Sequence, residues 1–416
     1  MALVASDIKG MLSITIKSRH DSHTDQYNRI FMVKILLVTS LVMGISWYSD
    51  SISCIIPEAH GISGGFVSQT CWIQGVYVYK ELKDRIDEVA YYGIPKDITL
   101  DGYLTNTENK ELCPMHPKLD KKPSEHCTHM HKTFFLQYQY FPFLVASFAI
   151  LFYVPYIFFR TANADLISLK NNIKEGEADA ENIAKHYFSK TTNPQRNNML
   201  RIVFNILIKI LYLVANLVCF LGLDRLLNGE YIGYGNKWIQ WSSLDNAVQY
   251  DYMGMRDHPK PGNELLPPFG YCEVHASAKD IKESYANKHK FVCELSQNVL
   301  YQYALVVLWF ALIIGIVVSC VGVLVLFIHY AIGIFGFKAQ GPTGKKIFKM
   351  LSFRELEYLE FIRKRDIALY GEVLDKLKDI KLGPHAPREE YPPRNGDDIP
   401  LYPTKGQYSD KPGYQL

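Results

Sequence analysis

Four long apolar runs dominate the pattern of hydrophobic and polar positions along the chain. They cover residues 30–48, 134–159, 202–223 and 295–328. Lys34 and Lys209 are the charged residues within them. Each run reaches the roughly 20 residues with which a helix crosses about 30 Å of hydrocarbon. None shows the polar face that a soluble core helix repeats about every 3.6 residues. The pattern therefore predicts an all-α membrane protein with four transmembrane helices.

The charges that flank the runs predict which helix ends face the cytoplasm. Four spans place both termini on one side, and Lys and Arg are more frequent near the helix ends on that side, which favours the cytoplasm. The first run is longer than a signal-peptide core and lacks a small-residue cleavage site, so we expect it to stay in the mature protein. The predicted order is a cytoplasmic N-terminal segment (1–29), helix 1 (30–49), a first outside loop (50–133), helix 2 (134–159), a cytoplasmic loop (160–201), helix 3 (202–223), a second outside loop (224–298), helix 4 (299–333), a cytoplasmic helical region (334–382) and a disordered C-terminal tail (383–416).

The cysteines test this topology independently, because disulfides persist in oxidising compartments and are rare in the cytosol. Most of the 8 cysteines fall in the predicted outside loops: Cys54, Cys71, Cys113, Cys127, Cys272 and Cys293. The predicted cytoplasmic segments contain none. Cys219 and Cys320 lie within apolar runs, where we expect them to act as small buried apolar side chains. The cysteine pattern therefore agrees with the predicted topology.

The second apolar run opens with a polar and aromatic signature: Tyr138, Gln139, Tyr140, Phe141 and Pro142. The stretch TCWIQGVYVY begins at residue 70, and FVCELSQNVLYQYALVVLWF leads into the fourth run. With two cysteines in each outside loop, these features resemble the innexins, in the innexin and pannexin superfamily of gap-junction and large-pore channels. The resemblance covers about residues 20–335. The chain departs from the family at Tyr140, where tryptophan is usual, at Ser53, where proline is common, and in two additional first-loop cysteines.

The resemblance implies a subunit of an oligomeric large-pore channel, a gap junction or hemichannel, that passes ions and small metabolites. The implied partners are identical or related subunits, eight in all by the family's pattern, a docked channel of an adjacent cell, and membrane lipids. The implied location is the plasma membrane, including cell junctions. The resemblance implies the disulfides Cys54–Cys293 and Cys71–Cys272, whereas four cysteines by themselves allow three pairings. We expect no cofactor, no metal and no enzymatic activity.

The first apolar run is the most polar of the four for its length, and the resemblance implies that it lines the pore. The pore-lining candidates are Lys34, Thr39, Ser40, Ser46 and Ser49. Polar side chains at membrane depth are tolerated where they face a water-filled cavity. Small residues also mediate helix packing, so packing stays the alternative for the serines and the threonine.

Pro142 predicts a bend near the outer end of the second helix, because proline removes a backbone hydrogen bond and clashes with the preceding turn. The freed carbonyl needs a donor, since lipid offers none, and Gln137 and Gln139 are candidates. The functional hypothesis is that this helix bend is coupled to gating of the channel. Tyr138 and Tyr140 also suit the headgroup level, so an interfacial aromatic belt without a further role is the alternative.

The stretch CPMHPKLDKKPSEHCTHMHK, residues 113–132, concentrates cysteine and histidine in the first outside loop. An oxidising compartment favours a local disulfide between Cys113 and Cys127, with a tetrahedral zinc site or free thiols as alternatives. The histidines of this stretch are His116, His126, His129 and His131. Because the unperturbed pKa of histidine is about 6.5, they would gain charge as the outside acidifies. This suggests a pH-sensing hypothesis, and a solvated loop with no such role is the alternative.

The remaining segments add less. Apolar residues at helical spacing in 345–382 and a helix-forming composition in 165–188 predict a cytoplasmic cap. A net charge of +3 does not indicate nucleic-acid binding. An enzyme is disfavoured because no phosphate loop, nucleophile elbow or pair of intramembrane acids occurs, and a transporter because no internal repeat is evident. The alternative function is a tetraspan adhesion or structural membrane protein without a pore, although the Cys-Cys-Gly and Trp-Cys-Cys patterns of such families are absent.

Overall fold

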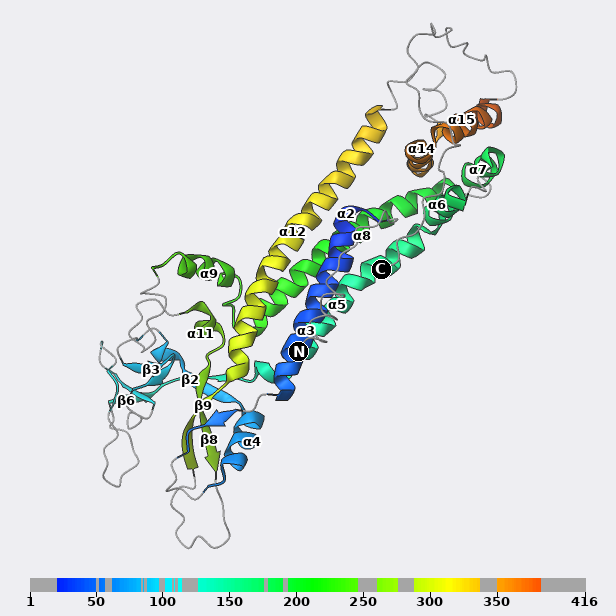
Figure 1. The fold of residues 1–416 in the computed structure, drawn as a ribbon. Coiled ribbons are helices and arrows are strands. Elements are labelled where there is room, and N and C mark those ends of the chain that lie inside the picture. The colour runs from blue at the N-terminus through cyan, green and yellow to red at the C-terminus, as the bar shows by residue number, and fades with distance from the viewer. Residues whose placement is uncertain are drawn as a thin grey trace. The chain divides into compact units, whose positions relative to one another are not determined.

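The computed structural model in Figure 1 describes the four apolar runs, most of the two loop segments that connect the first run to the second and the third to the fourth, and a group of helices near the C-terminus. The described residues are 21–49, 52–56, 62–83, 85, 88–96, 102–106, 108, 111–113, 126–175, 179–189, 194–245, 260–275, 288–336 and 350–382. The predicted disordered tail and His116 lie outside them. The chain divides into two compact units, one formed by 1–174 and 199–331 and the other by 175–198 and 332–416.

Within the described residues, the first unit contains four helices that are long and apolar enough to cross a membrane. They cover His23–Ile45, Gln137–Ala162, Arg196–Leu226 and Ser296–Ala331. The corresponding elements are α2 (His23–Gln26), the π-helical η1 (Tyr27–Met32) and α3 (Val33–Ser49), followed by α5 (Gln137–Ala162), α8 (Gln195–Leu226) and α12 (Ser296–Gly336). Figure 1 shows them running alongside one another. The prediction of four helices of transmembrane length and composition is confirmed.

Several of these helices extend beyond the apolar runs, because helical hydrogen bonding continues through polar residues. The first helix begins at His23, where the hydroxyl of Ser22 accepts a hydrogen bond from the backbone N–H of Asp25 at 3.4 Å. Such a side-chain cap satisfies one of the amide groups that a helix leaves without an internal partner. The apolar pattern alone therefore underestimates the length of the helices.

The loop segments between the spans form β-sheet, which the all-α prediction missed. Five antiparallel strands pair in the order β1-β9-β8-β2-β7. These strands are β1 (Ser53–Cys54), β2 (Val76–Tyr79), β7 (Lys132–Phe135), β8 (Phe269–His275) and β9 (Lys288–Glu294). Two further pairs are β3 (Val89–Tyr91) with β4 (Ile94–Pro95) and β5 (Tyr103–Thr105) with β6 (Cys127–His129). The class is therefore mostly helical with a sheet in the loops, and all-α is wrong for these segments.

The loop segments also carry short helices around the sheet. These are α4 (Gly64–Gln74), the 3-10 turn η3 (Lys80–Leu82), α9 (Tyr234–Ser242) and α11 (Pro261–Leu265), and α6 (Ala164–Glu175) follows α5. One contiguous apolar core runs from the sheet, through Val76 and Cys272, into the spans at Phe141 and Leu308. The sheet and the spanning helices are therefore packed as one body.

The second unit contains the helices α7 (Ala180–Tyr187), α14 (Phe353–Arg365) and α15 (Ile367–Leu382). Tyr358 of α14 is fully buried and makes edge-to-face contacts with Tyr187 and Phe188. Ser352 and Glu355 form a reciprocal capping box that fixes the start of α14. Segments from both sides of α8 in the sequence thus share one small helical core.

Candidate functional site

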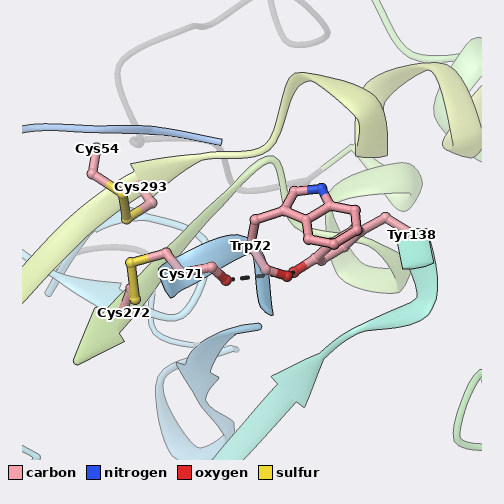
Figure 2. Close-up of a disulfide and its surroundings, with 6 residues drawn as sticks. All are labelled: Cys54, Cys71, Trp72, Tyr138, Cys272 and Cys293. Atoms are coloured by element: carbon pink, nitrogen blue, oxygen red, sulfur yellow. Dashed lines mark hydrogen bonds between the residues drawn. A yellow bond between two sulfur atoms is a disulfide. The ribbon is translucent and has the colours of Figure 1, made fainter. Parts of the chain in front are cut away.

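Two disulfides join the two loop segments, one between strands of the five-stranded sheet and one between helix α4 and the sheet. Cys54 and Cys293 are register partners on β1 and β9 and are bonded to each other, and Cys71 of α4 is bonded to Cys272 of β8. These are the pairs that the family resemblance implies. The sulfur atoms of Cys54, Cys71 and Cys293 lie within 4.8 Å of one another, and Figure 2 shows the two bridges side by side. Both loop segments are therefore covalently joined at one place, where α4 meets the sheet.

A third disulfide joins Cys113 to Cys127 within the first loop segment. Of the alternatives that the sequence left open for this pair, the structure has the local disulfide and not the zinc site. Two neighbouring histidines make separate contacts. The centre of the His129 ring is 4.2 Å from that of the Tyr103 ring. His131 contacts Glu81 through both its backbone N–H and its ring.

Glu81 and His131 form an exposed polar pair at the edge of the loop segment. The Nδ1 atom of His131 is 2.6 Å from a carboxylate oxygen of Glu81. Burial alone would raise the pKa of Glu81, but the hydrogen bonds from His131 outweigh it, and the pKa is lowered. The His131 side chain is 84% exposed.

The Tyr-Gln signature at the start of α5 caps the C-terminal end of α4. The hydroxyl of Tyr138 donates to the carbonyl of Trp72 at 2.6 Å, and the amide of Gln139 donates to the carbonyls of Trp72 and Ile73 at 2.6 and 3.1 Å. The last four carbonyls of a helix have no intrahelical donor, so these contacts satisfy groups that would otherwise be unpaired. Figure 2 shows Tyr138 beside Trp72 and the Cys71–Cys272 bridge. The second span is thereby attached directly to the disulfide-bonded loop.

Pro142 lies inside α5 and leaves the carbonyl of Tyr138, four residues earlier, without its helical donor. The hydroxyl of Tyr301 on α12 contacts this carbonyl at 3.5 Å and that of Met43 on α3 at 3.2 Å. Gln139, one of the two glutamines expected to supply this donor, donates to α4 instead. One tyrosine hydroxyl thus connects three spanning helices beside the proline.

The structure places the pore-lining candidates on different faces of α3. Ser40 donates to the carbonyl of Pro142 at 2.6 Å, and Thr39 is buried at 8% exposure. Both side chains therefore take part in helix packing, which was the alternative to lining a pore. Lys34 is half-buried. The side chains of Ser46 and Ser49 lie outside the described part of the chain. The exposed stripe of α3 carries large apolar residues: Leu37, Leu41 and Ile45.

One face of the sheet carries a charge and aromatic cluster that sequence reasoning did not find. Glu273 contacts Lys132 at 2.6 Å, Lys288 at 2.7 Å and the hydroxyl of Tyr77 at 2.6 Å. Burial alone would raise the pKa of Glu273, but these hydrogen bonds outweigh it and lower the pKa to about 2. Burial, with Tyr79 and Glu273 nearby, raises the pKa of Tyr77 far above its ordinary value.

Lys290 extends this cluster with cation–π contacts. Its Nζ lies 4.0 Å from the ring centre of Tyr271 and 4.9 Å from that of Tyr79, and it donates to the Tyr79 hydroxyl at 2.9 Å. The sequence carries a signal for this cluster in the alternating lysines of KHKF and the alternating tyrosines of VYVY. Neither stretch, however, indicates with which strand it pairs. The cluster pairs strands from both loop segments and reinforces the disulfides.

Four spanning helices whose connecting segments share a disulfide-bonded sheet define a multi-pass membrane protein with tied loops. The Innexin family model matches residues 21–365, so the chain belongs to the innexin family. The chain is also 23% identical over 201 residues to Innexin inx3 of Drosophila melanogaster, which covers 46% of this chain and 47% of that protein. The chain thus spans about half the length of this curated relative.

Proposed function

We propose that the chain is a subunit of an oligomeric large-pore channel, working as a gap junction or hemichannel and passing ions and small metabolites. Its membership of the innexin family carries this proposal. The four apolar helices and the disulfide-bonded sheet that joins both loop segments support it, because a pore shared by several subunits needs loops of fixed shape.

The proposed arrangement has both termini in the cytoplasm, loops 50–133 and 224–298 outside, and the protein in the plasma membrane, including cell junctions. The three disulfides in those loops support an oxidising outside compartment. Identical or related subunits surround a central axis, eight in number by family resemblance, and the outer ends dock onto a channel of an adjacent cell.

The proposed pore wall includes the first span, with Lys34, Ser46 and Ser49 as the polar candidates. Thr39 and Ser40 instead hold this span against its neighbours, since Ser40 donates to α5. Cysteine scanning over residues 34–49 with a charged thiol reagent tests this, in a background lacking Cys219 and Cys320. We expect modification to reduce current at positions along one helical face, and insensitivity at every position would contradict a pore wall here.

The channel itself is tested by expressing the full chain in single and paired cells. We expect dye uptake or outward current in single cells, or electrical coupling in pairs, and a central pore in images of the detergent-solubilised particle. The matched control is Cys320→Ser, since this α12 cysteine is free and exposed. Surface-delivered protein that forms monomers and carries neither dye nor current would instead support the adhesion or structural alternative.

A further inference from the structure

Helix α9 begins at the level where the third apolar run ends. Asp224 directly follows that run, and its carboxylate accepts hydrogen bonds from the backbone N–H groups of Tyr231 and Ile232, both at 3.0 Å. The hydroxyl of Tyr231 donates to the carbonyl of Leu305 on α12, also at 3.0 Å. An ionised side chain is costly inside hydrocarbon, so we place the boundary between membrane and water at this level of both helices.

Hydrogen bonds hold the start of α9 against α12 (Figure 1). The hydroxyl of Tyr234 donates to the carbonyl of Gln302 at 2.9 Å, and the indole of Trp309 donates to the carbonyl of Ile232 at 3.1 Å. A Cβ at Gly235 would overlap the Trp309 ring, so glycine lets the two helices approach closely. Specific contacts thus keep α9 at the level of the boundary.

An aromatic cluster lies between α9 and α12 at this level. The ring centre of Trp238 is 5.5 Å from that of Trp241 and 5.7 Å from that of Tyr303 on α12. Both tryptophans are half-buried, while Tyr303 is 48% exposed and the neighbouring Ile239 is 53% exposed. Tryptophan and tyrosine are enriched where membrane meets water, because they combine an apolar ring with a polar group. The cluster therefore suits the depth of lipid headgroups.

Tyr303 also belongs to an exposed apolar stripe along α12. The exposed side chains of this helix include Val299, Tyr303, Val307, Phe310 and Ile314. Their intervals of four, four, three and four residues place them on one helix face. The stripe runs from the aromatic cluster into the apolar span. An acyl chain that lies along it has its headgroup beside Tyr303.

Lys260 brings a positive charge to the aromatic cluster. Its Nζ donates to the Tyr303 hydroxyl at 2.8 Å, and it lies 4.4 Å from the ring centre of Tyr303 and 5.6 Å from that of Trp238. These distances are those of cation–π contacts. The Lys260 side chain is half-buried. An ammonium group has three donors, so the bond to Tyr303 leaves two for a ligand.

Two other lysines of this region are paired with carboxylates. Lys237 of α9 contacts Glu264 of α11 at 2.5 Å, and Lys83 contacts Glu230 at 3.3 Å. Within the part of the chain that the structure describes, Lys260 forms no such ion pair and contacts aromatic rings instead. The region thus keeps one positive charge for an anion from outside the chain.

We propose that Lys260, Trp238 and Tyr303 form a binding site for the phosphate group of a membrane phospholipid. Lysine binds phosphate as a point charge, and Lys260 repels a positively charged headgroup. The rings contact the start of the lipid chains, and one acyl chain lies along the α12 stripe. The site does not depend on the proposed channel function. Through it, a bound lipid holds α9 and the second loop segment at the membrane surface.

The test measures the affinity of the purified full chain for lipid at this position. A fluorophore on Ile239→Cys, in the chain lacking the free Cys219 and Cys320, is quenched by a lipid that carries a nitroxide near the start of one acyl chain. The probes are phosphatidylglycerol and a diacyl galactolipid without phosphate. We expect phosphatidylglycerol to bind about fivefold more tightly, the effect of one lysine beside an anionic lipid.

Substitutions of Lys260 assign this difference to its charge. Lys260→Gln should weaken the binding of phosphatidylglycerol about fivefold and leave that of the galactolipid unchanged, whereas Lys260→Arg should retain the preference. Equal affinity of the wild type for the two lipids overturns the proposal, and this comparison decides it even where Lys260→Gln fails to fold. Displacement of the lipid by an equal concentration of inorganic phosphate also overturns it.

The matched control is Lys288→Gln, which removes the same charge at the end of β9 that is farther along the chain from α12. It should leave both affinities unchanged. A loss equal to that of Lys260→Gln would show that lysine acts only through the net charge of the protein, and would overturn the site.

A second copy of the chain is the competing occupant of the α12 stripe. If copies met at this face, Lys260→Gln would change the size of the detergent-solubilised particle and leave both lipid affinities unchanged. That result overturns the proposal. A particle of unchanged size with weakened binding of phosphatidylglycerol supports it.

Discussion

Tyr138 and Gln139 explain why polar residues open an apolar span. They donate hydrogen bonds to the C-terminal carbonyls of α4, which lies in the first loop segment. The Tyr138 side chain is nevertheless buried, at 1% exposure. An aromatic residue with a hydroxyl at its tip suits a boundary between apolar and polar surroundings. The resemblance supplied this signature, but its physical partner, the end of a helix that the sequence pattern did not predict, is visible only in the structure.

Removing these donors should weaken the attachment of α5 to the loop stepwise. Tyr138→Phe should cost about 1 kcal/mol, because Gln139 still donates to the Trp72 carbonyl. Adding Gln139→Leu leaves a carbonyl without these donors and should cost about 1–3 kcal/mol more. The thermal unfolding midpoint of the purified protein measures both. The control is Tyr140→Phe, on a side chain 39% exposed, and an equal loss there would contradict the argument.

Glu273 should make the stability of the five-stranded sheet depend on acid pH. Its folded pKa of about 2 lies below its ordinary value of 4.5, so its contribution is present above that value and is lost as pH falls toward 2. The wild-type unfolding midpoint should fall over this window. Glu273→Gln should lower the midpoint at neutral pH and flatten this dependence. Glu294→Gln, an exposed position on β9, is the control, and the same flattening there would count against the cluster.

At the scale of elements, the spans could be predicted and the sheet could not. An apolar run of transmembrane length has few alternatives, so the positions of α5, α8 and α12 follow from the sequence. Strand β2 is buried at all four positions and shows no alternation, and its neighbour β8 comes from the other loop. Lys209 was visible as a lone charge, but its partner Asp25 lay in a segment assigned to the cytoplasm, because the apolar run begins only at residue 30.

The packing of α8 against α12 depends on Gly315. A Cβ at this position would lie 2.2 Å from the side-chain oxygen of Asn216, closer than real Cβ contacts allow. Gly315→Ala should therefore push the two helices apart and cost about 1–3 kcal/mol as an overpacking change. The control is Gly44→Ala in α3, where no atom lies within 4 Å of the added Cβ. Unfolding midpoints and surface delivery compare the two, and equal behaviour would refute the close approach.

At the scale of the whole molecule, strands from two loops meet in one sheet whose strand order no local pattern specifies. The strands of the first loop flank those of the second in the order β1-β9-β8-β2-β7, so neither loop can complete the sheet by itself. The cross-loop bridges span 239 and 201 residues of sequence, and the local bridge spans 14. Constraining a longer loop removes more entropy from the unfolded chain.

The three bridges should therefore differ in how much they contribute to stability and to surface delivery. The chain-entropy relation gives about 5 kcal/mol for each cross-loop bridge and about 3 kcal/mol for Cys113–Cys127, and a cross-loop bridge also fixes the sheet to which α5 is attached. We expect Cys54→Ser with Cys293→Ser, and Cys71→Ser with Cys272→Ser, to abolish surface delivery and current. Cys113→Ser with Cys127→Ser should lower the unfolding midpoint yet leave a delivered protein. Surface labelling and current recorded on the same cells separate these outcomes. Normal currents from either cross-loop variant, or a greater loss from the local one, would show that the joined sheet is not what holds the two loop segments together.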